Sequence, residues 1–305
     1  MIETSILKEI EAFASEGALL YNEPLRNHTT FKVGGEADAF LSVKTQEELI
    51  KAVRLCCEKK VPYFILGNGS NLLVSDKGYR GLVISIGKEM ACITCEGKRI
   101  TAQAGALLST VAQKAARNGL TGMEFASGIP GRIGGAMVMN AGAYDGEMKM
   151  IVESVTILSE DGQIRTFSNE EMEFGYRTSR LKRENGIVLS VTVLLEEGDK
   201  DTIFEKMKDF AARRREKQPL EYPSAGSTFK RPEGYFAGKL IMDAGLRGYT
   251  VGGAQVSEKH CGFVINKAEA TAEDIYSLIQ HVKAKVEEAS GVTLEPEVIF
   301  VGDFG

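Results

Sequence analysis

Apolar residues along the chain recur at helical spacing in some segments and in short continuous runs in others, which predicts a mixed α and β protein. One helical pattern follows Thr45-Gln-Glu-Glu48, whose residue types are typical of an N-terminal capping box. The same pattern follows Thr271-Ala-Glu-Asp274, and Gly291 would end that helix. Helices are also predicted over 109–118 and from about 200 to 217.

Short apolar runs bounded by turn residues predict the strands. Asp161-Gly162 is a hairpin signal between two such runs. The run from Ile187 to Leu195 is apolar at nearly every position, as in a strand covered on both faces. Near the end of the sequence, Pro296 suits the edge or the start of a strand. Strands are predicted over 61–66, 81–86, 99–104, 154–158, 163–167, 187–195 and 294–301.

Two glycine-rich loops are the most informative part of the chain. Gly67-Asn-Gly-Ser-Asn71 follows a predicted strand, and residues 122–146 include seven glycines. Glycine lets a flat or anionic ligand approach the main chain closely, and successive N–H groups after a strand can bind phosphate oxygens. The pair therefore indicates a long ligand with a pyrophosphate, although ordinary tight turns are the alternative. Because Leu72 replaces the third glycine of G-x-G-x-x-G, the first loop is not a Rossmann fingerprint.

Composition excludes several classes of protein. The 305 residues allow two domains, and 43% hydrophobic with 26% charged residues is typical of a soluble globular protein. A net charge of −5 and only one short basic run, 213–215, argue against nucleic-acid binding. We expect a cytoplasmic protein, because the sequence shows neither a signal peptide nor an apolar run long enough to span a bilayer. Five cysteines, three scattered histidines and a lone C-x-x-C at residues 92–95, without a second ligand pair, predict no metal site.

Six short motifs occur in order along nearly the whole chain: Asn27–Gly35, Leu66–Val74, Ser127–Ala136, Tyr176–Ser179, Ala225–Lys230 and Leu294–Val298. Together they resemble the motifs of one enzyme family. The family is the UDP-N-acetylenolpyruvoylglucosamine reductases, also called UDP-N-acetylmuramate dehydrogenases or MurB. Because only 49 residues separate Arg177 from Ser227, the chain is similar to the shorter, type II branch, which lacks an insertion carrying a substrate-binding tyrosine.

The resemblance implies an α+β fold with two functional regions. A two-lobed FAD-binding domain of the vanillyl-alcohol-oxidase (PCMH) type would cover residues 1–200, with lobes of about 1–80 and 81–200. A smaller α+β substrate-binding domain would cover residues 201–305. Non-covalent FAD would lie on the two glycine loops, at Gly67, Asn68, Gly69, Ser70, Asn71, Leu72, Gly128, Ile129, Pro130, Gly131, Gly134, Gly135, Ala136, Asn140 and Gly142.

The resemblance also implies a reaction. The family reduces the enolpyruvyl ether of UDP-N-acetylglucosamine enolpyruvate to UDP-N-acetylmuramate, a peptidoglycan precursor of the bacterial cell wall. Hydride would pass from NADPH to FAD N5 and on to the vinyl carbon, while Ser227 protonates the adjacent carbon. Arg177 and Glu297 would bind the substrate carboxylate, with Glu297 as a neutral acid whose pKa burial must raise. The substrate contacts would be Tyr176, Arg177, Lys217, Ser227, Arg231 and Glu297.

Some functional details stay open at this point. Arg213, Arg214, Arg215, Lys217 and Arg231 are candidates for the substrate diphosphate by charge, although a solvated helix face explains at least two of them. We expect a monomer that binds a UDP-sugar and NADPH. The alternative functions are a same-fold oxidase or dehydrogenase of a hydroxy acid or sugar, and a catalytically silent binder of FAD or UDP-sugars.

Overall fold

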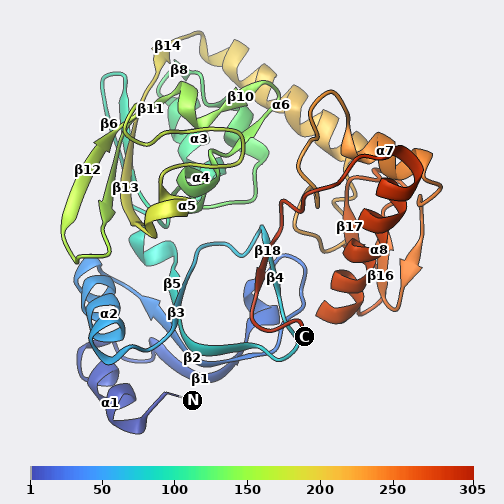
Figure 1. Ribbon diagram of the computed structural model, residues 1–305. Coiled ribbons are helices and arrows are strands. Elements are labelled where there is room, and N and C mark those ends of the chain that lie inside the picture. The colour runs from blue at the N-terminus through green and yellow to red at the C-terminus, as the bar shows by residue number, and fades with distance from the viewer. Residues whose placement is uncertain (1) are drawn as a thin grey trace. The chain divides into compact units, whose positions relative to one another are not determined.

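The structure is a computed structural model that describes residues 2–305 (Figure 1). The chain folds into two compact units, each assembled from three separate segments and each with its own hydrophobic core. The predicted functional boundary near residue 200 stays a prediction. Unit 1 comprises Met1–Leu20, Ala39–Asn68 and Gly81–Arg213, and unit 2 comprises Tyr21–Asp38, Gly69–Arg80 and Arg214–Gly305.

Unit 1 contains a five-stranded antiparallel sheet of order β12-β11-β13-β7-β6. Helices α3 (Leu108–Arg117) and α4 (Ile133–Met139) pack against it (Figure 1). The predicted hairpin at Asp161-Gly162 is confirmed, since it joins β11 to β12. The strands are β6 (Ile93–Glu96), β7 (Arg99–Gln103), β11 (Val152–Leu158), β12 (Ile164–Ser168) and β13 (Ile187–Leu194).

A second sheet is four-stranded, of order β1-β2-β5-β3. Within it β3 runs parallel to β5, and β3 ends at Leu66 immediately before the first glycine loop. Its strands are β1 (Leu19–Pro24), β2 (Glu36–Val43), β3 (Tyr63–Leu66) and β5 (Tyr79–Ile86). Further helices before residue 218 are α1 (Thr4–Phe13), α2 (Gln46–Lys59), α5 (Leu181–Glu184) and α6 (Lys200–Lys217). Two short strand pairs also lie there, β8 (Leu120–Thr121) with β14 (Glu196–Glu197) and β9 (Gly142–Ala143) with β10 (Gly146–Glu147).

Helix α2 begins as the sequence predicts, with the Thr45 side chain accepting a hydrogen bond from the Glu48 N–H. The buried Glu48 carboxylate accepts bonds from the Lys44 N–H at 2.7 Å and from the N–H and hydroxyl of Ser15 at 2.9 and 2.5 Å. Burial alone would raise the pKa of Glu48, but these hydrogen bonds outweigh it, so the pKa lies below its usual 4.5. The ionised carboxylate thus ties the segment around Ser15 to the start of α2.

Glu48→Gln should therefore destabilise the protein in a pH-dependent way. A group whose pKa is lowered by folding stabilises the native state above its unfolded-state pKa and loses that effect as pH falls through the folded-state pKa. We expect a loss of about 1–3 kcal/mol in the free energy of unfolding at pH 7, shrinking below about pH 4.5. Chemical denaturation across this pH range measures the difference. The exposed neighbour provides the control, since Glu47→Gln should have little effect.

Unit 2 is built around helix α8 (Ala272–Ser290), which packs on a three-stranded antiparallel sheet. The predicted capping box is confirmed, because Thr271 and Asp274 exchange hydrogen bonds, and Gly291 ends the helix in the left-handed conformation. The sheet strands are β15 (Thr250–Val251), β16 (Ala254–Val256) and β17 (Val264–Asn266), and helix α7 (Ala237–Asp243) precedes them.

The end of the described chain forms a parallel pair with a segment far earlier in the sequence. Strand β18 (Ile299–Val301) pairs with β4 (Leu72–Val74), so the strand is shorter than the one predicted over 294–301. Pro296 explains the difference, because it cannot donate to a ladder and takes part only in an isolated bridge with Phe229.

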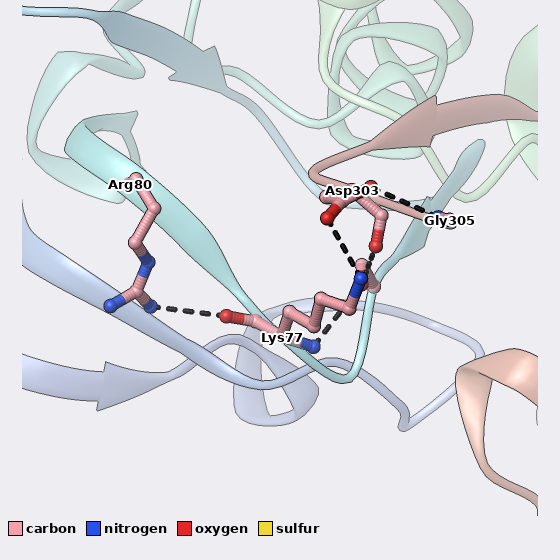
Figure 2. Close-up of polar contacts among 5 residues, drawn as sticks. Lys77, Arg80, Asp303 and Gly305 are labelled. Carbon is pink, nitrogen blue, oxygen red and sulfur yellow. Dashed lines mark hydrogen bonds and ion pairs between the residues drawn. The ribbon is translucent and has the colours of Figure 1, made fainter.

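The loop after β4, residues 75–78, stabilises the pairing of β4 with β18. Figure 2 shows Asp303 bound to Lys77, whose Nζ lies 2.8 Å from the carboxylate, and Arg80 donating to the Lys77 carbonyl. The Ser75 hydroxyl donates to the Asp303 carbonyl at 2.5 Å. Within the same loop, both oxygens of Asp76 accept backbone N–H groups from the first turn of α8, at 2.9 and 3.0 Å. The loop therefore holds both β18 and the start of α8.

Candidate active site

The two glycine-rich loops meet within unit 1. Asn68, in the first loop, donates from Nδ2 to the carbonyl of Pro130 in the second, at 2.8 Å. A Cβ on Gly67 would lie 3.9 Å from the Cβ of Arg132, so the two loops are also in van der Waals range. Residues 67–68 and residues 128–136, which the sequence predicts to bind the same cofactor, therefore lie next to each other in the structure.

Backbone hydrogen bonds determine the path of the second loop. The N–H groups of Ile133 and Gly134 donate to the carbonyls of Ala106 and Ala104, at 2.8 and 3.0 Å. A Cβ on Gly134 would lie 3.0 Å from that of Ala104, so this glycine allows close packing on the end of β7. At Gly135, which is exposed, a Cβ would meet nothing within 4 Å. Of Gly134 and Gly135, Gly135 is therefore the one with free space beside it for a ligand.

Asn140 connects the glycine-rich segment to the loop that carries Arg177. It is fully buried and left-handed, with a φ of 43°. Its Nδ2 donates to the Gly175 carbonyl at 3.1 Å, and its Oδ1 accepts the Lys149 N–H at 2.9 Å. The side-chain amide of Asn140 therefore stabilises the fold of unit 1 by linking these two segments.

Tyr176 and Arg177 occupy the tip of a tight turn. Gly175 and Thr178 exchange backbone hydrogen bonds of 3.0 and 3.3 Å on either side of them. Arg177 is left-handed, with a φ of 54°, which is rare for a residue with a side chain and is typical of functional positions. Its guanidinium lies 5.1 Å from the Tyr176 ring centroid and donates to the Gly142 carbonyl at 3.4 Å. The turn presents a cation beside the glycine-rich segment of the same unit.

In unit 2, the remainder of the first glycine loop packs on the Asn27–Gly35 motif. Gly69 has a φ of 60°, and a Cβ there would lie 2.0 Å from the His28 carbonyl oxygen, so only glycine fits. The Gly69 carbonyl accepts the Thr30 N–H at 3.1 Å. Asn71 donates from Nδ2 to the Glu297 carbonyl at 3.0 Å, and its own carbonyl accepts the Ile299 N–H. The loop residues Ser70 and Asn71 and buried Leu72 thus lead into β4 beside Glu297.

The segments carrying Ser227 and Glu297 lie side by side in unit 2. The Glu297 N–H donates to the Thr228 carbonyl at 2.8 Å, and the Lys230 N–H donates to the Glu295 carbonyl at 2.9 Å. Thr228 is buried and its hydroxyl accepts the Val264 N–H at 2.9 Å, whereas Ser227 is exposed and Glu297 is half-buried. Two motifs about 70 residues apart in sequence therefore lie on adjacent extended segments, joined by the isolated bridge between Phe229 and Pro296.

The two remaining predicted substrate contacts are exposed cations of unit 2. Lys217 is the last residue of α6. Arg231 follows the Ser227 motif, donates from Nε to the Tyr235 carbonyl at 3.3 Å, and stacks 4.0 Å from the Phe236 ring centroid. Both can meet an anionic ligand from solvent.

Arg132 is a candidate that sequence reasoning missed. Its Nε is buried and has no hydrogen-bond partner among the residues that the structure describes. Its NH1 donates to the Gly105 carbonyl. A cation with an unused donor between two glycine loops fits an anionic group such as the FAD diphosphate. The only signal in the sequence is a charged residue within an otherwise small and apolar segment.

Family comparisons agree with this geometry. Residues 37–168 match the model of an FAD-binding domain, and residues 218–301 match that of the UDP-N-acetylenolpyruvoylglucosamine reductase C-terminal domain. With the α+β architecture described above, these matches define the protein as an FAD-dependent oxidoreductase and confirm the predicted fold class.

Full-length relatives identify the family. The chain is 51% identical to UDP-N-acetylenolpyruvoylglucosamine reductase of Caldanaerobacter subterraneus subsp. tengcongensis over 98% of each chain. It is 51% identical to the same enzyme of Lachnoclostridium phytofermentans, over 98% of this chain and 97% of the relative. The crystal structure of the Thermus caldophilus enzyme superposes with a TM-score of 0.81 at 39% identity, over 92% of this chain and 98% of that one. The chain belongs to the UDP-N-acetylenolpyruvoylglucosamine reductase family.

The helices of the described residues can also be compared with the length and hydropathy that a membrane-spanning helix needs. No helix within residues 2–305 is both long enough and apolar enough to cross a bilayer.

Proposed function

We propose that the protein reduces the enolpyruvyl ether of UDP-N-acetylglucosamine enolpyruvate to UDP-N-acetylmuramate, with NADPH as the reductant, in peptidoglycan precursor synthesis. The observation that carries the proposal is the pairing of the Ser227 and Glu297 segments, whose hydroxyl and carboxyl groups belong to adjacent extended segments. Membership of the reductase family supports it. The cytoplasmic location and the monomeric state remain predictions.

We assign FAD binding to the region 1–200 and substrate binding to 201–305. The cofactor would contact the two glycine loops at the predicted positions, from Gly67 to Leu72, from Gly128 to Gly131, and from Gly134 to Ala136, with Gly142 and the backbone of Asn140 beyond them. Bound FAD would supply the hydride-transfer chemistry, and the protein would supply binding, orientation and charge.

Three side chains would act on the substrate carboxylate and on the reacting carbons. Addition of hydride to the terminal vinyl carbon moves negative charge onto the adjacent carbon and its carboxylate, where a cation and hydrogen-bond donors must meet it. Arg177 would supply the cation and Glu297, as a neutral acid, a hydrogen bond. Ser227 would then transfer its hydroxyl proton to the adjacent carbon and recover a proton from water. A serine hydroxyl is a very weak acid, so it suits only a strongly basic acceptor such as an enolate carbon.

Three further residues would bind other parts of the substrate. Tyr176 is exposed at the tip of the turn that carries Arg177. Lys217 and Arg231 are the exposed cations that we propose for the diphosphate. The shorter branch lacks the insertion tyrosine that would otherwise serve this group, which is why these cations are the candidates.

The experiment that tests the proposal separates the two half-reactions. Purified protein is reduced by NADPH without oxygen, and UDP-N-acetylglucosamine enolpyruvate is added while flavin absorbance is recorded. Stoichiometric return of the oxidised spectrum is the expected result. A flavin that stays bleached until oxygen is admitted would instead favour a same-fold oxidase, and a protein that takes up no FAD would contradict the assignment of the glycine loops.

A further inference from the structure

Arg132 is an unusual cation within unit 1. Its side-chain stem lies along Gly67, since a Cβ on that glycine would be 3.9 Å from the Arg132 Cβ and 4.0 Å from its Cδ. Its backbone belongs to the second glycine loop, where it is the residue before α4. One side chain therefore spans both loops, and the Asn68 bond to Pro130 holds them together beside it.

The charge of Arg132 lacks compensation in the described part of the chain. Its one hydrogen bond goes from NH1 to the Gly105 carbonyl, and no carboxylate there pairs with it. Its Nε is buried without a partner, and burial lowers the pKa of the guanidinium. A half-buried cation with a desolvated, unpaired donor is costly, and a bound anion can supply the missing hydrogen bond and the opposite charge.

We propose that Arg132 binds the diphosphate of FAD, with its Nε–H and its remaining guanidinium N–H groups donating to the phosphate oxygens. Arginine suits this task because its planar fork of donors matches phosphate geometry and its charge is permanent. The Gly105 bond positions the guanidinium in advance, so little side-chain freedom is lost on binding. This inference rests on the proposed placement of FAD at the two loops, and it adds a side-chain cation to a site otherwise made of backbone and glycine.

The substrate also carries a diphosphate, but the position of Arg132 favours the cofactor. The residue lies inside the segment 37–168 that matches the FAD-binding domain, between two loops assigned to FAD. The exposed cations Lys217 and Arg231 belong to unit 2, which holds the C-terminal domain match. Binding of a UDP-sugar by Arg132 is therefore the competing outcome of the test.

The test measures FAD affinity rather than turnover, so it is independent of the proposed reaction. Apoprotein is prepared for the wild type, for Arg132→Met and for a matched control, Arg54→Met, and titrated with FAD by flavin fluorescence. Arg54 is an exposed arginine of the same unit that also donates to a backbone carbonyl, that of Gly162. We expect Arg132→Met to weaken FAD binding by about 10- to 100-fold, as for loss of a charged hydrogen bond, and Arg54→Met to have no effect.

Melting of the apoproteins separates binding from folding. Because Arg132→Met removes a half-buried charge with no counter-ion among the described residues, its apoprotein should melt at or above the wild-type temperature while its stabilisation by FAD shrinks. Unchanged FAD affinity overturns the proposal, and so does a fall in apoprotein stability that accompanies the loss of FAD. Unchanged FAD affinity with weaker binding of the UDP-sugar substrate to the holoprotein would assign Arg132 to the substrate diphosphate instead. Failure of the protein to turn over the substrate leaves the FAD titration valid.

Discussion

Ser227→Ala should lower kcat by about 10²- to 10⁴-fold, the usual contribution of a positioned proton donor. Ser227 is exposed, and its hydroxyl is the group that we assign to protonation of the carbon next to the reduced one. Reduction of the bound flavin by NADPH should keep its wild-type rate, because no proton from Ser227 is needed there. Stopped-flow absorbance measures the two half-reactions separately, and equal slowing of both would contradict the assigned role.

The adjacent hydroxyl provides a matched control. Thr228 is fully buried and accepts the Val264 N–H at 2.9 Å, so its hydroxyl serves the fold. Thr228→Val leaves that donor without a partner and should cost about 1–3 kcal/mol of stability. We expect Thr228→Val to lower the stability of the protein but to keep the rate of substrate reduction. Ser227→Ala should keep the stability and lose most of that rate. A thermal melt of each variant beside its single-turnover rate distinguishes the two effects.

Glu297→Ala should lower kcat by about 10²- to 10³-fold, as for removal of one donor that meets developing negative charge. Glu297→Gln should be far milder, by about tenfold, because the amide still donates a hydrogen bond and loses only part of its strength. This difference follows from the proposal that Glu297 acts as a neutral acid. Steady-state kinetics of the two variants measures it, and an equal loss in both would refute the neutral form.

The pH dependence of the same variants gives an independent readout. If protonated Glu297 is required, wild-type kcat falls as pH rises through the titration of that group, and Glu297→Gln removes this limb of the profile. Glu295→Gln is the control, because Glu295 is an exposed carboxylate on the same segment and pairs with Lys230 at 2.8 Å. Its replacement should leave both kcat and the profile unchanged, since an exposed pair contributes little.

Local chemistry explains which elements the sequence predicts well. Helices α2 and α8 have capping residues and apolar spacing that act within a few residues, so Thr45 and Thr271 mark their starts correctly. The missed elements depend on distant partners instead. Helix α4 contains two glycines in succession and forms because Gly134 must pack against Ala104. Glycine propensity argues against a helix there, and tertiary packing overrides it.

Some residues of the candidate site can likewise be predicted from the sequence, and others cannot. The glycine positions point to the two loops for a chemical reason, whereas Ser227 and Glu297 are found only through the resemblance of their motifs to the family. The left-handed conformation of Arg177 and the orphaned Nε of Arg132 leave no trace in the sequence, since both arise from how distant segments pack. The placement of cofactor and substrate on these residues remains the proposal that the variants above test.

The bonds from the loop 75–78 to β18 and α8 also limit which fragments of the protein can fold alone. A fragment that begins near residue 214 would lack β4, the strand with which β18 pairs, and it would also lack the Asp76 carboxylate at the start of α8. The C-terminal region is therefore not a portable module. It could be exchanged between relatives only together with the segments 21–38 and 69–80, and during synthesis its core is completed only after the final strand has emerged.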